Sequence, residues 1–313
     1  MTPEKNGSRK EDLKRLLLYL LLAFVPVWLW FALVWGITGR QPWQDMSELQ
    51  QSLVSLGMLG PVLAHVATRL ITKEGCATTG RDSMMLGIEL KKGKWFFFVL
   101  AILLPWLYSE MGNAFDLLLG KGVFDPAYYR EFDMDKRTVL LFPLAAVTSG
   151  VTASFAAFGE EGGWRGYMMP KLLRLMGRTP ALLLGGVIWG LWHAPLTAIG
   201  HNYGTDYPGF PWLGILRMCI MCTLMGVILT FLVAKSGSVW TAAILHAVSN
   251  AGPTILAGFV RPAKSVNPNA LSFLIDGWEI ALLLIAAVLL LVWDKVPGAE
   301  AAPEAAQVRG KAA

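Results

Sequence analysis

The sequence predicts an all-α fold, a polytopic membrane protein built as one bundle of about eight transmembrane helices. Its 313 residues are 55% hydrophobic and only 16% charged, whereas soluble domains carry about 25% charged residues. The mean hydropathy is +0.50. Apolar runs near the roughly 20 residues that a spanning helix needs recur along the chain. These runs are Leu16–Gly36, Leu53–Ile71, Trp95–Leu118, Thr138–Phe158, Thr179–Ala198, Trp212–Ala234, Val239–Gly258 and Trp278–Trp293.

The chain divides into one membrane domain and two short polar ends. Residues 1–15 are polar and basic, and we expect a disordered cytoplasmic segment there, anchored at the membrane interface. Residues 16–294 form a single transmembrane domain. Its first run is long and lacks a cleavage site, so it is a retained helix and not a signal peptide. Residues 295–313 are rich in Ala, Pro and Glu, which predicts a disordered cytoplasmic tail.

The charge distribution indicates how the chain is oriented. The net charge is +5 and the isoelectric point is about 9.1. With eight spans and a cytoplasmic N-terminus, most Lys and Arg residues fall on the inner side, which explains the basic balance without a nucleic-acid partner. We therefore expect a multi-pass protein of a bacterial inner membrane with both termini cytoplasmic. The lipid bilayer is its predicted partner, and Lys91, Lys92 and Lys94 are expected to lie at anionic headgroups.

Ionisable residues directly follow the fourth run. The segment 159–167 contains Glu160, Glu161 and Arg165, and charges at membrane depth are costly enough to be functional candidates. Glu161 and Arg165 are four residues apart and share a helix face, whereas Glu160 is rotated by about 100° toward another partner. Gly162 and Gly163 allow a bend or a close helix approach. Pro170 is expected to end or kink the helix that follows.

Two later motifs add imidazoles and an amide. Trp189 and His193 lie on one helix face, and so do His246 and Asn250. With the Glu160 carboxylate, this set could hydrolyse an acyl bond: a carboxylate deprotonates water, an imidazole orients it and neutral donors stabilise the oxyanion. The same residues would also suit interhelical hydrogen bonds or an ion pathway, so a transporter or structural role remains open.

Depth in the membrane sets a condition on this site. At a rise of about 1.5 Å per residue, His193 and His246 lie near mid-membrane or in the inner leaflet, whereas Glu160 is at the inner end of the fourth run. For the three to meet, the fourth helix must end early inside the protein, or the bundle must be thinned and hydrated there. Polar structure at that depth requires a protein-lined cavity.

Other polar residues within the runs have simpler interpretations. His65 is expected to hydrogen-bond a neighbouring helix, and Glu110 could pair with Arg217 inside the bundle. Cys219 and Cys222 are one turn apart but have no second ligand pair, so they are interpreted as small apolar side chains.

The three motifs together resemble the CPBP family of intramembrane glutamic endopeptidases, also called the Abi or CAAX-protease family, which includes the Ras-converting CAAX prenyl endopeptidase. The match extends from Phe158 to Asn250, and the family core would be residues 138–258. The resemblance implies that Glu160 and His193 activate a water, and that His246 and Asn250 form the oxyanion hole.

In the same family Glu161 and Arg165 would support the site, and Trp189 is expected to support it too. Trp189 stands where Phe is common, a change expected to be tolerated. No cofactor is expected, because the helical His-Glu-x-x-His pattern of zinc proteases is absent. The open alternatives are a zinc protease, using Glu160, His193 and His246 as ligands, and a non-proteolytic immunity factor, scaffold or transporter. A membrane-associated peptide or protein is the expected substrate.

Overall fold

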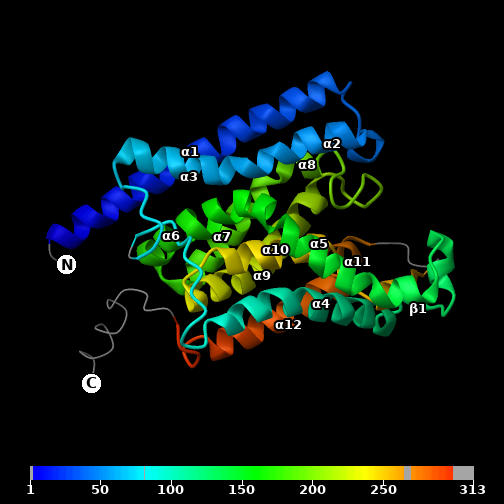
Figure 1. Ribbon diagram of the computed structural model, residues 1–313. Helices are drawn as coiled ribbons and strands as arrows, with labels where there is room; N and C mark the ends of the chain where they lie inside the picture. Colours follow the sequence, from blue (N-terminus) through cyan, green and yellow to red (C-terminus); the bar gives the residue numbers. More distant parts are fainter. Residues whose placement is uncertain (1–2, 81, 264–268, 299–313) are drawn as a thin grey trace.

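The computed structural model describes residues 3–80, 82–263 and 269–298, and nearly all of its regular structure is helical (Figure 1). The all-α prediction is confirmed. The helices are α1 (Pro3–Ile37), α2 (Glu48–Ser55), α3 (Gly60–Thr72), α4 (Trp95–Leu118), α5 (Lys136–Gly163), α6 (Met169–Met176), α7 (Arg178–Trp192), α8 (Ala194–Thr197), α9 (Trp212–Ser236), α10 (Trp240–Asn250), α11 (Ala270–Leu274) and α12 (Gly277–Val292).

Five helical segments in the described part of the chain are long and apolar enough to cross a membrane, not eight. They are Ser8–Ile37, Glu48–Thr72, Trp95–Leu118, Lys136–Met176 and Trp212–Ser236. The other three predicted runs correspond to α7, α10 and α12, which have 15, 11 and 16 residues. At about 1.5 Å per residue, 11 residues extend roughly 16 Å, half of a hydrocarbon core. The short helices are nevertheless apolar, because they pack against longer ones: α10 against α5 and α4, α7 against α9, and α12 against α4.

The outer face of α1 shows why the segment suits a lipid environment. Leu17, Leu21, Val25 and Leu29 follow one another at intervals of four residues and are 47–65% exposed. Tyr19 on the opposite face is completely buried. A helix with this much aliphatic surface on its outside is typical of a bundle surrounded by hydrocarbon.

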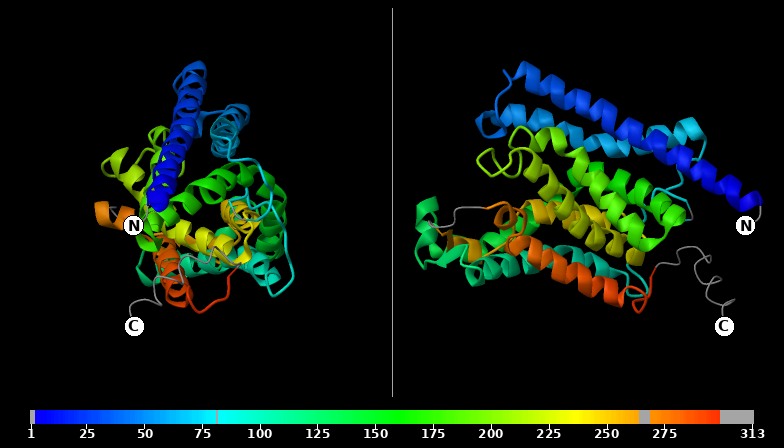
Figure 2. Two further views of the ribbon diagram at one scale, coloured as in Figure 1. Left: turned by 90° about the vertical axis from the view of Figure 1, so that its left-hand side faces the viewer. Right: turned by 180° about the vertical axis from the view of Figure 1, so that it is seen from behind.

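The ends of the chain differ in part from the prediction. Helix α1 begins at Pro3, so residues 3–15 are not a separate disordered segment but the first turns of a long helix. Residues 1–2 lie outside the described residues. The predicted tail lies largely outside the described residues, since only 295–298 of it are described. The beginning of α1 and the end of α12 lie at the same end of the bundle (Figures 1 and 2), as an arrangement with both ends on one side of a membrane requires.

The bundle has a layered arrangement (Figures 1 and 2). Helices α1 and α3 pack together on one side, and α4 packs with α12 on the opposite side. Between these pairs lie α5, α7, α9 and α10. At one end, β1 (Gly122–Phe124) pairs antiparallel with β2 (Val260–Pro262), with Val123 opposite Arg261. This small sheet closes the loops that follow α4 and α10.

Two local departures from α-helix geometry occur in the motif segments. A π-helical turn, Trp164–Met168, joins α5 to α6, and Pro170 lies in the first turn of α6. Pro170 therefore does not end the helix. Its missing N–H coincides instead with the change of hydrogen-bond pattern just before it. The second departure is at His193, which separates α7 from α8 two residues before Pro195.

Candidate functional site

The position of Glu160 within its helix resolves the question of depth. The helical segment Lys136–Met176 has 41 residues, so Glu160 lies inside it and is not at its inner end. Sixteen residues, about 24 Å of helix, separate Glu160 from Met176. The helix need not end early and the bundle need not be thinned, because the chain continues helically through the π turn. The expectation that the fourth span ends near Phe158 was wrong.

Glu160 is buried, at 3% exposure, and faces two residues of the second motif. The indole Nε1 of Trp189 donates a hydrogen bond of 2.8 Å to Glu160 Oε2. The Nε2 atom of His193 lies 4.0 Å from the same oxygen, too far for a direct hydrogen bond. The Nδ1 atom of His193 is 2.9 Å from the backbone carbonyl of Trp189. Because a carbonyl only accepts, Nδ1 carries a proton, and in the neutral ring Nε2 presents a lone pair toward Glu160.

Glu161 is completely buried and has different partners. Its Oε1 atom accepts a hydrogen bond of 3.1 Å from Arg165 Nη1 and one of 2.8 Å from His246 Nδ1. The pair with Arg165 spans the beginning of the π turn. The two adjacent carboxylates are thus separated, as their angular positions on the helix predict: Glu161 is neutralised locally, and Glu160 points to the second motif.

Trp189 connects more of the site than the sequence indicates. Besides the bond to Glu160, its ring lies beneath the guanidinium of Arg165, at 4.0 Å from Cζ to the ring centroid. Its ring also meets that of His246 edge-on at 5.6 Å. The spacing of four residues predicts only that Trp189 shares a helix face with His193, and those rings are 6.0 Å apart. A Phe at this position would keep the ring contacts but would lack the N–H donor.

Asn250 ends α10 and is exposed. It lines one cavity of about 890 Å³ together with Glu160, His193 and His246, so all four predicted catalytic residues open onto the same space. Trp189 also lines this cavity, whereas Glu161 and Arg165 lie behind it and are not among its lining residues.

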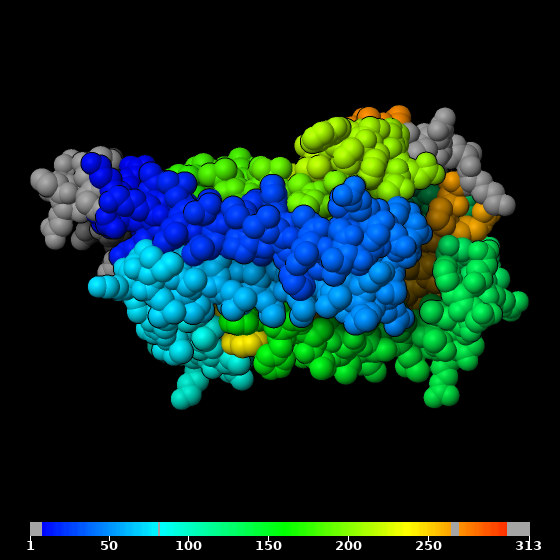
Figure 3. All heavy atoms as spheres, turned by 90° about the horizontal axis from the view of Figure 1, so that it is seen from above, coloured from blue at the N-terminus to red at the C-terminus, as the bar shows by residue number. Residues whose placement is uncertain are grey.

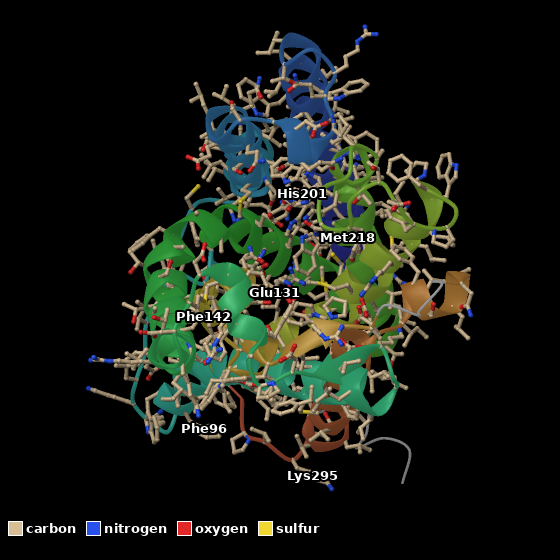
Figure 4. The ribbon with its side chains drawn as sticks, turned by 90° about the vertical axis from the view of Figure 1, so that its right-hand side faces the viewer. Phe96, Glu131, Phe142, His201, Met218 and Lys295 are labelled. Atoms are coloured by element: carbon tan, nitrogen blue, oxygen red, sulfur yellow. The ribbon has the colours of Figure 1, made fainter. Side chains whose placement is uncertain are left out.

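The cavity extends well beyond these residues. Its other walls come from α1, from the segment 43–58, from the segment that follows α8, from α9, and from the beginning of α12. Seen from above, α1 and the following blue segment cover one side of the bundle, and the yellow-green segment after α8 rises beside them (Figure 3). In Figure 4, the lining residue His201 and the buried Met218 lie toward the middle of the molecule, whereas Phe96 and Lys295 lie at its edge.

Arg217 also lines the cavity but has different partners from those expected. It donates to Glu279 at 2.8 Å and also bonds Asp276. Glu110 instead accepts hydrogen bonds from the backbone N–H groups of Ile255 and Leu256. The predicted Glu110–Arg217 pair is therefore wrong. Sequence spacing could not have shown that Asp276 and Glu279, which cap the beginning of α12, would pair with Arg217 instead.

Comparison with known proteins identifies the segment that carries these residues. Residues 142–252 match the family described as Type II CAAX prenyl endopeptidase Rce1-like, which confirms the resemblance over that segment. The chain is also 29% identical over 142 residues to CAAX prenyl protease 2 of Methanococcus maripaludis. That alignment covers 45% of this chain and 47% of the relative, so the similarity extends over less than half of either protein. All seven predicted site residues lie within the matched segment.

Proposed function

We propose that this chain, whose residues 142–252 match the Rce1-like CAAX prenyl endopeptidases, is a membrane endopeptidase that cleaves membrane-associated peptides or proteins. Glu160 and His193 activate the attacking water, and His246 and Asn250 stabilise the oxyanion. The observation that carries the proposal is the 4.0 Å separation of Glu160 Oε2 and His193 Nε2 at the wall of a large cavity. The name of the Methanococcus relative supports the same class of reaction.

The separation of the two acceptors suits a bridging water. A water with hydrogen bonds of about 2.8 Å to each atom fits at the apex of a triangle with a 4.0 Å base. Both atoms accept, so the water donates one O–H to the carboxylate and one to the imidazole. Its lone pairs then point away from both groups, toward a substrate carbonyl. As the oxygen attacks, Glu160 takes the proton.

Stabilisation of the oxyanion falls to groups on α10. The Nδ1 atom of His246 is used by Glu161, which leaves Nε2 for the cavity. This nitrogen donates to an oxyanion only when His246 is an imidazolium, because in the neutral ring the Nδ1–H bond makes Nε2 an acceptor. The amide of Asn250 donates in either case. Two donors aimed at the developing charge provide the kind of stabilisation that acyl hydrolysis needs.

Glu161, Arg165 and Trp189 act as supports in this mechanism. Glu161 holds His246 by a bond of 2.8 Å, and Arg165 offsets the charge of Glu161. Trp189 orients the Glu160 carboxylate through its indole N–H and holds the His193 tautomer through its carbonyl. A fixed carboxylate and a fixed tautomer reduce the reorganisation that the reaction requires.

We propose that the reaction needs no metal. In the described residues, no group of three or more His, Cys, Asp and Glu side chains is arranged so that it could hold a metal ion. The nitrogen of His246 nearest a carboxylate already bonds Glu161, which is not one of the three candidate zinc ligands. A zinc protease using Glu160, His193 and His246 could keep this bond, since a histidine ligand commonly donates its other ring N–H to a carboxylate, so the chelator test decides between the two.

Location and substrate follow as part of the proposal. The apolar helices suit a multi-pass membrane protein. We propose a bacterial inner membrane with both termini cytoplasmic, because the beginning of α1 and the end of α12 lie at the same end of the bundle (Figures 1 and 2). The substrate is a peptide or protein held at that membrane. A cavity of about 890 Å³ has room for several residues of an extended peptide.

The test is cleavage of a fluorogenic peptide panel by the full chain in liposomes. Glu160→Gln should reduce kcat/KM by at least about a hundredfold, the lower range for loss of a general base. Glu48→Gln, an exposed carboxylate on α2, is the matched control and should cleave like the wild type. Cleavage that survives in Glu160→Gln would refute the mechanism.

Two further measurements separate the proposed protease from a zinc protease and from a transporter or scaffold. The wild type with a chelator should cleave at an unchanged rate, whereas loss of activity that zinc restores would show a metalloprotease. A transporter or scaffold would leave every peptide intact while still binding it.

A further inference from the structure

We propose that His65, on α3, is a positioning residue for the Glu160–Glu161 segment. It would fix the end of α5 at the place where the helix changes to the π turn. The inference rests on the proposed protease function. His65 lies outside the matched segment 142–252, and it does not line the catalytic cavity.

The first step is the hydrogen bonding of the His65 ring. The ring is completely buried, and its Nδ1 atom is 2.7 Å from the carbonyl oxygen of Gly162. Its Nε2 atom accepts a hydrogen bond of 2.6 Å from Arg69 Nε. A carbonyl only accepts and a guanidinium only donates, so both ring nitrogens have their roles set by their partners. His65 is therefore neutral with the proton on Nδ1.

The second step is the location of the bonded carbonyl. Gly162 directly follows Glu161 and comes two residues before the π turn Trp164–Met168. The His65 ring also packs against the turn itself, with its centroid 4.7 Å from that of Tyr167. His65 thus contacts both the chain just before the π turn and the turn itself. A π bulge alters how the residues before it are rotated relative to those after it, and the Glu161–Arg165 pair crosses this junction.

The third step is the close contact between α5 and the chain around α3. A Cβ on Gly159 would lie 2.6 Å from the carbonyl oxygen of Met58, and one on Gly163 would lie 2.4 Å from that of Pro61. Backbone therefore meets backbone at two glycines that are one turn apart and flank Glu160 and Glu161. In this tight interface the His65 bond sets the rotation of α5, because the glycines provide closeness but no directional contact.

Arg69 holds His65 in turn. Besides its bond to His65, the guanidinium donates to the carbonyls of Gly75 and Ser83 at 3.0 Å each. The loop after α3 is thereby tied to the ring. The chain of contacts runs from this loop through Arg69 and His65 to Gly162, and from there to both carboxylates.

The kinetic test compares three variants of the full chain. His65→Leu removes the donor at similar volume and should lower kcat about ten- to a hundredfold with KM changed less than twofold, since misplacement of a reacting group by about 1 Å can cost that much. His65→Asn keeps an N–H near the Nδ1 position and should recover a large part of kcat. Thr68→Val is the matched control. Within the described part of the chain its hydroxyl bonds only the Ala64 carbonyl of α3, and kcat should remain unchanged.

A spectroscopic test works even without turnover. The chain has four histidines, so ¹⁵N-histidine NMR can resolve them, and the signal lost in His65→Asn identifies His65. We expect the neutral ring with Nδ1 protonated, and in His65→Leu we expect the His193 and His246 signals to shift while Thr68→Val leaves them in place.

Each outcome decides something. The opposite tautomer at His65, or unchanged His193 and His246 signals in His65→Leu, would overturn the positioning role. So would a variant whose KM rises while kcat is kept, or equal losses of kcat in His65→Leu and His65→Asn. A wild type that cleaves no peptide would instead refute the proposed function, and the NMR signals would still decide the positioning role.

Discussion

Replacing Glu161 by Gln keeps the size of the side chain and removes its charge. In the native protein Glu161 and Arg165 are 0% and 3% exposed, and their atoms Oε1 and Nη1 are 3.1 Å apart. No other ion pair of Arg165 occurs within the described residues. In Glu161→Gln, the guanidinium is therefore a buried charge with no counter-ion, although the amide oxygen can still accept its hydrogen bond.

The expected magnitudes come from what buried pairs cost. Removing one partner of such a pair destabilises a protein by about 3–5 kcal/mol, whereas replacing both by neutral groups of similar volume is often close to neutral. Glu161→Gln and Arg165→Met should therefore each lower the free energy of unfolding by about 3 kcal/mol or more. The double variant should lie within about 1 kcal/mol of the wild type, so the two changes are strongly non-additive.

The assay is reversible unfolding in mixed micelles, followed by tryptophan fluorescence. The control cycle uses the exposed pair Glu11 and Lys14, whose side chains are 53% and 74% exposed at 3.2 Å. Its coupling should stay below about 1 kcal/mol. Single-variant losses at residues 161 and 165 that simply add in the double variant would refute the buried-pair reasoning.

Peptide cleavage by the same variants separates stability from function. The double variant should regain stability but not activity. Without a negative charge at position 161, the imidazolium form of His246 is not stabilised, and only that form has a donor on both ring nitrogens. Full activity in the double variant would show that the pair serves the fold alone.

Two further predictions concern the frame of the site. Gly163→Ala places a Cβ 2.4 Å from the Pro61 carbonyl oxygen, so it should lower the free energy of unfolding by about 1–3 kcal/mol and reduce kcat. Gly36→Ala is the control and should be tolerated, because no atom lies within 4 Å of the new Cβ. Equal melting temperatures for the two variants would contradict the close packing. Glu74 lies just after α3, where burial raises its pKa but hydrogen bonds from Lys171, Tyr167 and Thr72 outweigh this and hold the pKa at about 2. Since the unfolded pKa is 4.5, this carboxylate contributes about 3 kcal/mol to the free energy of unfolding above pH 4.5. The contribution is lost as the pH falls from 4.5 toward 2. In Glu74→Gln the melting temperature should therefore vary less over that range than in the wild type.

The sequence predicted the helical class, and it singled out residues that the fold brings to one cavity, because both depend on local features. Apolar runs define buried or lipid-facing helices whatever their neighbours, and spacings of four residues place Glu161 with Arg165 on one face. The number of spanning helices could not be predicted in the same way. An 11-residue helix enclosed by protein, such as α10, is as apolar as a spanning one, and only its contacts tell the two apart.

The depth of the site depended on a feature with no clear pattern in the sequence. Charged residues at the end of an apolar run normally indicate that the helix has reached water, so Glu160 was placed at the boundary. In the structure, two of the polar residues are neutralised inside the protein, Glu161 by Arg165 and Lys171 by Glu74. Arg174 is exposed and pairs with Asp12. The helix therefore continues to Met176, and the carboxylates lie well inside it.

Trp189, at a position where the family commonly has Phe, makes a contact that a Phe could not make. A ring at this position is enough to stack on Arg165 and to contact His246, and those contacts are compatible with Phe. The indole adds a donor that reaches Glu160 at 2.8 Å, from the same residue whose carbonyl sets the His193 tautomer. Because one residue then orients both Glu160 and His193, a shift of α7 would move the two side chains together. The 4.0 Å gap between them is accordingly maintained by Trp189 more than by either group alone.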